Sequence, residues 1–303
     1  MKYIAPDYYM NFSCIADKCS HNCCIGWEID IDEKTLEYYK TAGGDIGSRL
    51  EKSIITENGT AYFKLDEKDR CPFLNDKNLC DIITGLGEKH LCNICADHPR
   101  FRNFFGDRVE IGIGLSCESA AKLILENREK VQLVIIQTDD TEETEYEEEQ
   151  SFYSFRNKLF SLLQNRLKPL NERIAELNII LPEKTYSEWS DIYASMEILD
   201  PDWKTILKKL KNADETELTP PTDDIPYEQL IIYFLYRHLA EGIYNGTIRA
   251  RIAFALHASQ IIYALCVVTG EDITEIARMY SAEIEYCEEN TEMLFKILGN
   301  CQH

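Results

Sequence analysis

The placement of the cysteines constrains this chain more than any other feature of its sequence. Nine of the 12 cysteines in the 303 residues lie within the first 117. The opening residues, MKYIAPDYYMNF, lack the basic segment and apolar run of a signal peptide, so we expect a cytoplasmic protein without lasting disulfides. Concentrated thiols in such a protein predict a metal or cluster site. The nine are Cys14, Cys19, Cys23, Cys24, Cys71, Cys80, Cys92, Cys95 and Cys117, whereas Cys266, Cys287 and Cys301 are scattered through helical patterns and are expected to pack as small hydrophobic residues.

The spacing of the nine thiols leaves the identity of the metal open. They run as C-x4-C-x3-C-C, then, after 46 residues, as CPFL-x5-C, C-x2-CADHPR and LSC. Structural zinc prefers two closely spaced pairs, and only Cys92/Cys95 forms a C-x2-C. Iron–sulfur clusters also use four cysteines but accept more scattered ones. We expect folding to gather thiols from four segments, with adjacent Cys23 and Cys24 pointing in different directions.

An acidic stretch, TDDTEETEYEEEQ at 138–150, marks the clearest boundary in the chain. Eight of its thirteen residues are acidic, which predicts a linker or solvated loop. Residues 1–137 alternate glycines, cysteines and short apolar runs, and predict an irregular cysteine-rich domain that binds a metal or cluster and contains a few short strands. Residues 151–303 carry apolar residues at helical spacing and predict an α-helical bundle. The predicted fold class is therefore mainly α.

Individual elements follow from capping and periodicity. In the first part we expect a helix over 32–40 capped by Asp32, strands over 59–66 and 108–116, a helix over 117–130 and a strand over 131–137. In the second part we expect helices over 152–163, 186–199, 202–211, 227–244, 247–268 and 272–298, with a Pro-bearing acidic connection at 212–226. The most apolar stretch, 252–268, contains His257, Ser259 and Gln260, so it predicts a buried helix and no membrane span.

The charge of the chain bears on its partners. The net charge is −21, from 32 Lys and Arg against 53 Asp and Glu. A field of this sign repels phosphate backbones, so we expect no nucleic-acid partner, and it attracts cationic substrates. Solubility alone explains the same charge equally well.

Motifs alone do not demonstrate a bound cofactor. The radical S-adenosylmethionine signature C-x3-C-x2-C is absent, because Gly26 occupies the third position after Cys19 and Cys23. The nearest glycine-rich turn, EIGIGLS, lacks the glycine density of a nucleotide-binding loop.

Four motifs in a fixed order carry a resemblance to a known family. They are FSCIADKCSHNCCIGWEIDID, CPFLNDKNLCDI, GEKHLCNICADHPR and GLSCESAAKLIL. From about Tyr8 to Leu125 the chain resembles the flagellin lysine-N-methylase family. The resemblance implies S-adenosylmethionine-dependent methylation of lysines on flagellin, or on another lysine-bearing protein, and a [4Fe-4S] cluster. It also implies that the metal ligands are among the matching cysteines Cys14, Cys19, Cys23, Cys24, Cys71, Cys80, Cys95 and Cys117.

This ligand set leaves two questions open. Eight thiols exceed the four that a single cluster needs, so either a second metal is bound or some thiols are structural. Cys92 lies where the family pattern does not require a cysteine, and is either accidental or a substitute ligand.

Methyl transfer to lysine adds further candidates, although it assigns no catalytic residue. The amine must be neutral, because an ammonium group has no lone pair. Arg100 is the candidate for binding the cofactor carboxylate through a bidentate ion pair. His98 and His21 are either metal ligands or packed histidines, and Trp27 is expected to shield the metal from water. The candidates for accepting the amine proton are Asp17, Glu28, Asp97 and Tyr8 or Tyr9.

Two alternatives to an enzyme remain. The cysteines alone equally support a non-catalytic zinc or iron module on a helical platform. The surplus thiols also suggest a redox or cluster-carrier protein, although no C-x-x-C lies beside a βαβ pattern.

Overall fold

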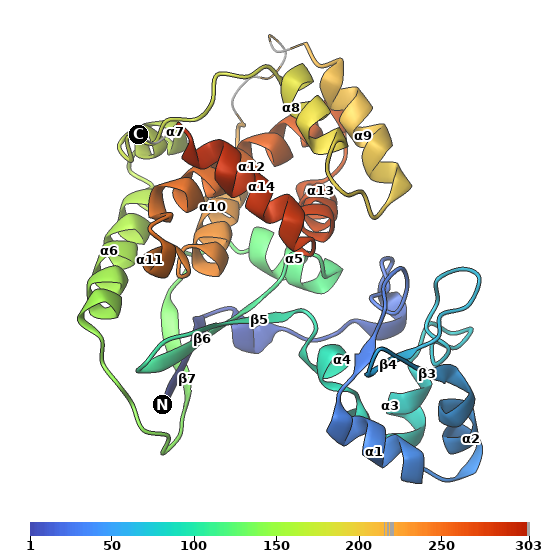
Figure 1. The fold of residues 1–303 in the computed structure, drawn as a ribbon. Helices are drawn as coiled ribbons and strands as arrows, with labels where there is room; N and C mark the ends of the chain where they lie inside the picture. Colours follow the sequence, from blue (N-terminus) through green and yellow to red (C-terminus); the bar gives the residue numbers. More distant parts are fainter. Residues whose placement is uncertain (215, 217, 219–220, 302–303) are drawn as a thin grey trace. The chain divides into compact units, whose positions relative to one another are not determined.

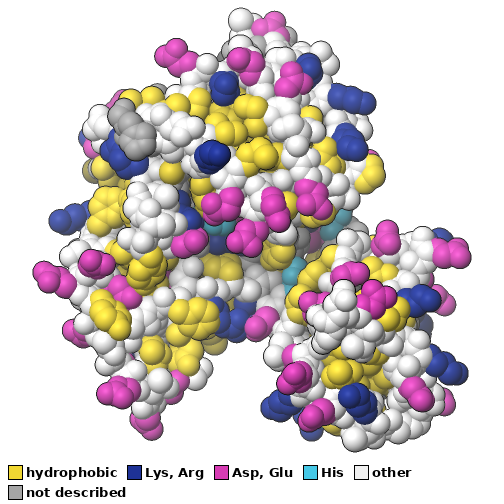
Figure 2. Space-filling model, in the orientation of Figure 1, with side chains coloured by type: hydrophobic (Ala, Val, Ile, Leu, Met, Phe, Trp, Pro, Cys, Tyr) yellow, Lys and Arg dark blue, Asp and Glu magenta, His cyan; other side chains and the backbone are white. Residues whose placement is uncertain are grey.

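About 53% of the residues are helical, which confirms the mainly α class. The computed structural model describes residues 1–301 except 215, 217, 219 and 220, so part of the predicted 212–226 connection lies outside the described residues. The chain forms two units (Figure 1). We call Ser13–Arg100 the cysteine-rich unit, and Met1–Phe12 together with Phe101–His303 the helical unit. Acidic side chains are scattered over the visible surface of both units, among basic, hydrophobic and other groups (Figure 2).

This division differs from the predicted boundaries at 137 and 151. Strand β1 (Lys2–Pro6) pairs in parallel with β6 (Arg108–Ile113) and antiparallel with β7 (Leu133–Thr138). With β5 (Arg100–Phe104) they form one sheet of order β5-β6-β1-β7. Both ends of the predicted cysteine-rich domain therefore belong to the helical unit, because strands distant in sequence pair there.

The predicted acidic linker at 138–150 also lies within the helical unit. Its last residues begin α6 (Glu147–Leu163), and the Glu149 side chain is buried. One Glu149 carboxylate oxygen accepts from the Gly106 amide at 3.0 Å, and the other accepts from the Tyr244 hydroxyl at 2.7 Å. Paired in this way, an acidic side chain can be buried in spite of its charged sequence neighbours.

The helices of the helical unit follow the predicted periodicity but differ in extent. The predicted helices over 117–130 and 186–199 end earlier, at Leu125 and Ala194. The predicted helix 227–244 ends at His238, and the predicted helix 272–298 is divided by a π-helical turn, η5 (Ser281–Glu285). This turn directs Glu285 inward, where its carboxylate binds His238 at 2.6 Å and the Tyr233 hydroxyl at 2.9 Å. Besides α6, the helices are α5 (Glu118–Leu125), α7 (Leu170–Ala175), α8 (Tyr186–Ala194), α9 (Pro201–Lys211), α10 (Ile225–His238), α11 (Gly242–Asn245), α12 (Ile248–Thr269), α13 (Ile273–Tyr280) and α14 (Glu288–Gly299).

Helix α12 forms the centre of the helical unit. It is long and apolar enough to cross a membrane, but 67% of its most apolar window is buried inside the unit. It packs against α9, α10, α13 and α14 (Figure 1). The predicted burial of this segment is confirmed.

A buried histidine in α12 predicts sensitivity to acid. His257 is 1% exposed, and its Nε2 lies 3.2 Å from the Tyr193 hydroxyl. Burial lowers the pKa of His257 from 6.5 to about 3. Below pH 6.5 the unfolded chain binds a proton that the folded chain does not, so this stability is present above pH 6.5 and is lost as the pH falls.

We therefore expect the free energy of unfolding to fall between pH 7 and pH 4 by roughly 3 kcal/mol more in the wild type than in His257→Gln. Urea titrations of both proteins at each pH measure this difference. Parallel pH dependence in the two proteins would contradict the prediction.

The cysteine-rich unit has its own small core. Asp32 caps α1 (Glu33–Thr41) by accepting from the Thr35 amide at 3.0 Å, as predicted. A three-stranded sheet has the order β2-β4-β3, in which β4 (Thr60–Phe63) is the strand predicted over 59–66. Two cysteines, Cys71 and Cys92, are among its few buried apolar residues, so we expect this unit to depend on a metal for stability. The remaining elements are η2 (Ala16–Lys18), β2 (Asp30–Ile31), α2 (Gly44–Ser53), β3 (Ile54–Glu57), α3 (Asp81–Leu86), η3 (Glu88–His90) and α4 (Asn93–Asp97).

Candidate metal centre

A closed loop brings Cys71 and Cys80 together. Leu74 and Cys80 form an antiparallel bridge, and the Asp81 amide donates to the Phe73 carbonyl at 2.8 Å. The CPFL segment therefore folds back on the start of α3, which follows Cys80 directly. Burial raises the pKa of the Cys71 thiol to about 11.

The paired cysteines lie against this loop. The Cys71 amide donates to the Cys24 carbonyl at 2.8 Å, and Gly26, at a φ of +89°, turns the chain away directly afterwards. The Cys24 thiol donates a hydrogen bond to Cys23, which lowers the pKa of Cys23 to about 7 and raises the pKa of Cys24. The two thiols therefore influence each other, and the different directions expected of their side chains stay a prediction.

The C-x2-C pair begins helix α4. Cys92 is its N-cap and Cys95 follows one turn later, so both thiols lie on the same side of the helix. The Cys95 thiol donates to Cys92, which raises the pKa of Cys95 and lowers the pKa of Cys92. The Cys92 residue is only 1% exposed.

Six thiols share one neighbourhood. Hydrogen bonding is the main cause of the raised pKa of Cys24 and Cys95, and burial is the main cause for Cys71. Charge on neighbouring thiols raises the pKa of all three further. Charge on Cys23 likewise raises the pKa of Cys80, after burial. Cys71 and Cys92 also lie in the small core of the cysteine-rich unit, and Cys24, Cys80 and Cys95 pack against it, which places these five side chains in one region. We call this group the thiol site; it consists of Cys23, Cys24, Cys71, Cys80, Cys92 and Cys95.

The thiol site fits a soft metal group. Tetrahedral zinc with four thiolates holds its sulfur atoms about 3.8 Å apart. Among the residues that the structure describes, no three of these thiols lie within 4.8 Å of one another. A four-iron cluster binds each thiolate to a different iron atom, so it accommodates wider spacing. Soft thiol ligands of this kind suit zinc or an iron–sulfur cluster.

The other three predicted ligands have surroundings of their own. Cys14 is exposed, and its thiol accepts from the Ala16 amide at 3.4 Å. Cys19 is partly exposed, and its thiol donates to the His21 carbonyl at 3.2 Å. Cys117 is the N-cap of α5 in the helical unit. The sequence does not distinguish these three from the motif cysteines that the fold brings together.

Other predicted residues lie beside the thiol site. The Trp27 indole donates to the Cys23 carbonyl at 2.5 Å, which is the position expected of a shielding residue. The His98 ring lies 6.0 Å from that of Trp27, and burial lowers the pKa of His98 to about 4. Arg100 donates to the Ala96 carbonyl at 3.4 Å, and its role in cofactor binding stays a prediction.

The predicted proton acceptors are divided between the two units. Asp17, Glu28 and Asp97 belong to the cysteine-rich unit, in η2, on an exposed loop and at the end of α4. Tyr8 and Tyr9 belong to the helical unit, where Tyr8 is buried in the apolar core.

Two charged residues that hold the cysteine-bearing segments in place were not predicted in this role. Asp32 accepts from the Asn93 amide at 2.9 Å, which ties α1 to the start of α4. Arg49, on α2, donates to Asp81 at 2.6 Å and to the Pro72 carbonyl at 2.8 Å, beside Cys80 and Cys71. The sequence marked Asp32 as a helix cap but gave no sign of its second partner.

We expect Asp32→Ala to weaken metal retention about tenfold, because supporting hydrogen bonds position metal ligands. The rate at which the full chain gives up its metal to a chelator measures the effect. Asp30→Ala, in the exposed position of β2, is the matched control. If Asp32→Ala and Asp30→Ala lose metal to the chelator at the same rate, the only role of Asp32 is to cap α1.

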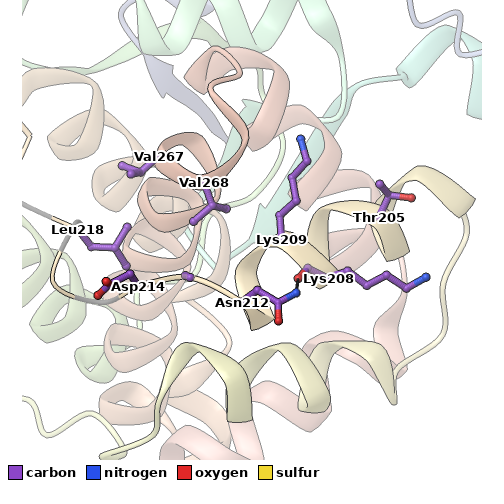
Figure 3. Close-up of a pocket in the computed structure, with 9 residues that line it drawn as sticks. Thr205, Lys208, Lys209, Asn212, Asp214, Leu218, Val267 and Val268 are labelled. Carbon is purple, nitrogen blue, oxygen red and sulfur yellow. Dashed lines mark hydrogen bonds between the residues drawn. The ribbon is translucent and has the colours of Figure 1, made fainter.

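The helical unit carries a hollow and a separate group of three polar side chains. The hollow, of about 580 Å³, lies between α9 and the end of α12 and contains none of the predicted site residues (Figure 3). Its lining consists of Thr205, Lys208, Lys209, Asn212, Ala213, Asp214, Leu218, Val267 and Val268. Elsewhere the buried Cys287 thiol lies 3.7 Å from Glu197 and 3.6 Å from Glu289, which gives it polar partners that the packing prediction did not include.

Comparison with known proteins shows which proteins this chain is similar to. Over 147 residues the chain is 28% identical to lysine-N-methylases of Salmonella choleraesuis and Salmonella typhimurium. The predicted resemblance to lysine-N-methylases is confirmed. The match covers 45% of this chain but only 36% of each lysine-N-methylase. The chain is also 27% identical over 134 residues to the flagellar biosynthetic protein FliU of Salmonella muenchen, covering 42% of this chain and 79% of FliU. No family model and no solved structure matches the chain.

Proposed function

We propose that this chain is a lysine N-methyltransferase with a cysteine-ligated [4Fe-4S] cluster. S-adenosylmethionine is the methyl donor, and flagellin or another lysine-bearing flagellar protein is the substrate. The observation that carries the proposal is that cysteines from three of the four motifs behind the lysine-N-methylase resemblance pack in or against one small core, at the thiol site. The names of the relatives support methylation of lysine and a link to the flagellum.

Four of the six thiols hold the cluster in this proposal, and the other two pack or bind a second metal. The bound cluster supplies a cross-link between three segments that the small apolar core of the cysteine-rich unit holds only weakly. Trp27, fixed through the Cys23 carbonyl, limits access of water to this side of the site.

Methyl transfer needs a neutral lysine amine. The amine lone pair attacks the methyl carbon, the carbon–sulfur bond of the donor breaks, and a proton leaves the nitrogen. Asp17, Glu28 and Asp97 are the candidates in the cysteine-rich unit for accepting that proton. Arg100 is the candidate for pairing with the donor carboxylate. The net charge of −21 favours approach of a cationic lysine.

Incubation of the full chain with S-adenosylmethionine and flagellin tests the activity. Mass spectrometry is expected to find a gain of one or more methyl groups on flagellin lysines. Flagellin whose lysines have been chemically dimethylated is the control and should gain no mass. If calorimetry shows no saturable binding of S-adenosylmethionine and no lysine gains mass, the enzymatic proposal is wrong.

A non-catalytic zinc or iron module is the second candidate. The observation in its favour is that the match covers only 36% of each lysine-N-methylase. A colourless protein that contains zinc and does not bind S-adenosylmethionine would support this module over the enzyme.

A further inference from the structure

We propose that Cys92 is a ligand of the metal centre in this chain and that Cys14 is not. The family pattern includes Cys14 and does not require a cysteine at position 92. This inference rests on the metal centre proposed above and specifies which residues of this chain form it.

The first argument is position. Cys92 is 1% exposed and packs in the core of the cysteine-rich unit with Cys71, which is 6% exposed. Cys14 is exposed and lies outside this core. Of these two cysteines, Cys92 therefore packs with Cys24, Cys71, Cys80 and Cys95, and Cys14 does not.

The second argument is the geometry of the C-x2-C pair. Cys92 and Cys95 occupy the N-cap and third positions of α4. In this arrangement the amide of the third residue points at the N-cap side chain, and the Cys95 amide does donate to the Cys92 sulfur. Two thiols held in this way on one side of a helix face the same metal centre, as the paired cysteines of structural metal sites do.

The third argument separates a ligand from a packed residue. A buried cysteine that only fills space needs no hydrogen-bond donors. The Cys92 sulfur accepts hydrogen bonds, and so do the sulfur atoms of both cysteines in the CPFL-x5-C motif. Backbone amides two and three residues further on donate to each of them, those of Phe73 and Leu74 to Cys71, and those of Ile82 and Ile83 to Cys80. Such donors stabilise the thiolate form that binds metals. Cys14 also accepts one amide, but it does so in an exposed loop.

Anaerobic reconstitution of the full chain with iron and sulfide tests the inference. After desalting, Cys92→Ser is expected to retain at least about threefold less iron and sulfide than the wild type, and Cys14→Ser to retain as much as the wild type. Full loading of Cys92→Ser, or loss of iron from Cys14→Ser, would overturn the inference. If the wild type itself binds no iron, the metal centre of the proposed function fails instead.

A rescue experiment keeps a loss of folding apart from the loss of a ligand. Cys92→Gly leaves a vacant ligand position that a small external thiol, 2-mercaptoethanol, is able to fill. Iron retention in this variant is expected to rise at least about threefold when the thiol is present during reconstitution. Iron loss that 2-mercaptoethanol does not reverse would mean that Cys92 acts through packing, and would overturn the inference.

Discussion

Replacing Cys71 with serine is expected to reduce the iron and sulfide content of anaerobically purified protein at least about tenfold. Cys71 lies between two other parts of the thiol site, because its amide donates to the Cys24 carbonyl and its loop closes onto Cys80. Its sulfur is also hydrogen-bonded by the Phe73 and Leu74 amides. The neighbouring thiols of Cys71 belong to all three segments that contribute cysteines to the thiol site. We therefore expect Cys71 in any set of four ligands.

Loss of the metal is expected to act on one unit only. The small core of the cysteine-rich unit should open to limited proteolysis in Cys71→Ser, whereas the helical unit keeps its large core. Cys266→Ser, in α12 of the helical unit, is the matched control and should keep both metal and resistance to proteolysis. Wild-type iron content in Cys71→Ser would exclude Cys71 as a ligand.

Arg156→Met is expected to lower the free energy of unfolding by about 3–5 kcal/mol. Arg156 and Glu110 are both fully buried, and two hydrogen bonds of 2.5 and 2.6 Å join α6 to β6. The guanidinium also lies 5.1 Å from the centre of the Phe152 ring. Methionine fills similar space but leaves the Glu110 carboxylate buried without its countercharge.

Urea unfolding followed by the helical signal measures this effect. The double variant Arg156→Met/Glu110→Leu is the control, because removing both charges should restore most of the lost stability. A single variant within about 1 kcal/mol of the wild type would show that Glu110 finds another partner or becomes protonated.

Local signals predicted much of the secondary structure. Asp32 before a Leu and Tyr face marked the start of α1, and period-2 alternation marked β4 and β6. The unit boundaries did not follow, because they depend on β1 pairing with strands more than a hundred residues away. The π-helical turn was also not predicted, since the residues that pair with Glu285 lie on another helix, distant in sequence.

The convergence of thiols was predictable from the sequence, but the cysteines that take part in it were not. The spacing of the cysteines and the expected cytoplasmic location predicted thiols that converge, and the fold brings six of them together. Whether Cys14, Cys19 and Cys117 join them depends on the path of the chain between motifs, which residue types do not encode locally. Asp32 and Arg49 were not predicted as supports for the same reason, because their partners Asn93 and Asp81 are distant in sequence.

Metal and sulfide analysis of the full chain purified without oxygen tests the central claim most directly. The account predicts a brown protein with about four iron and four sulfide per chain. It also predicts that most thiols of the thiol site are inaccessible to alkylation until the metal is removed. A colourless protein that binds neither iron nor zinc, and whose thiols all react at once, would contradict it.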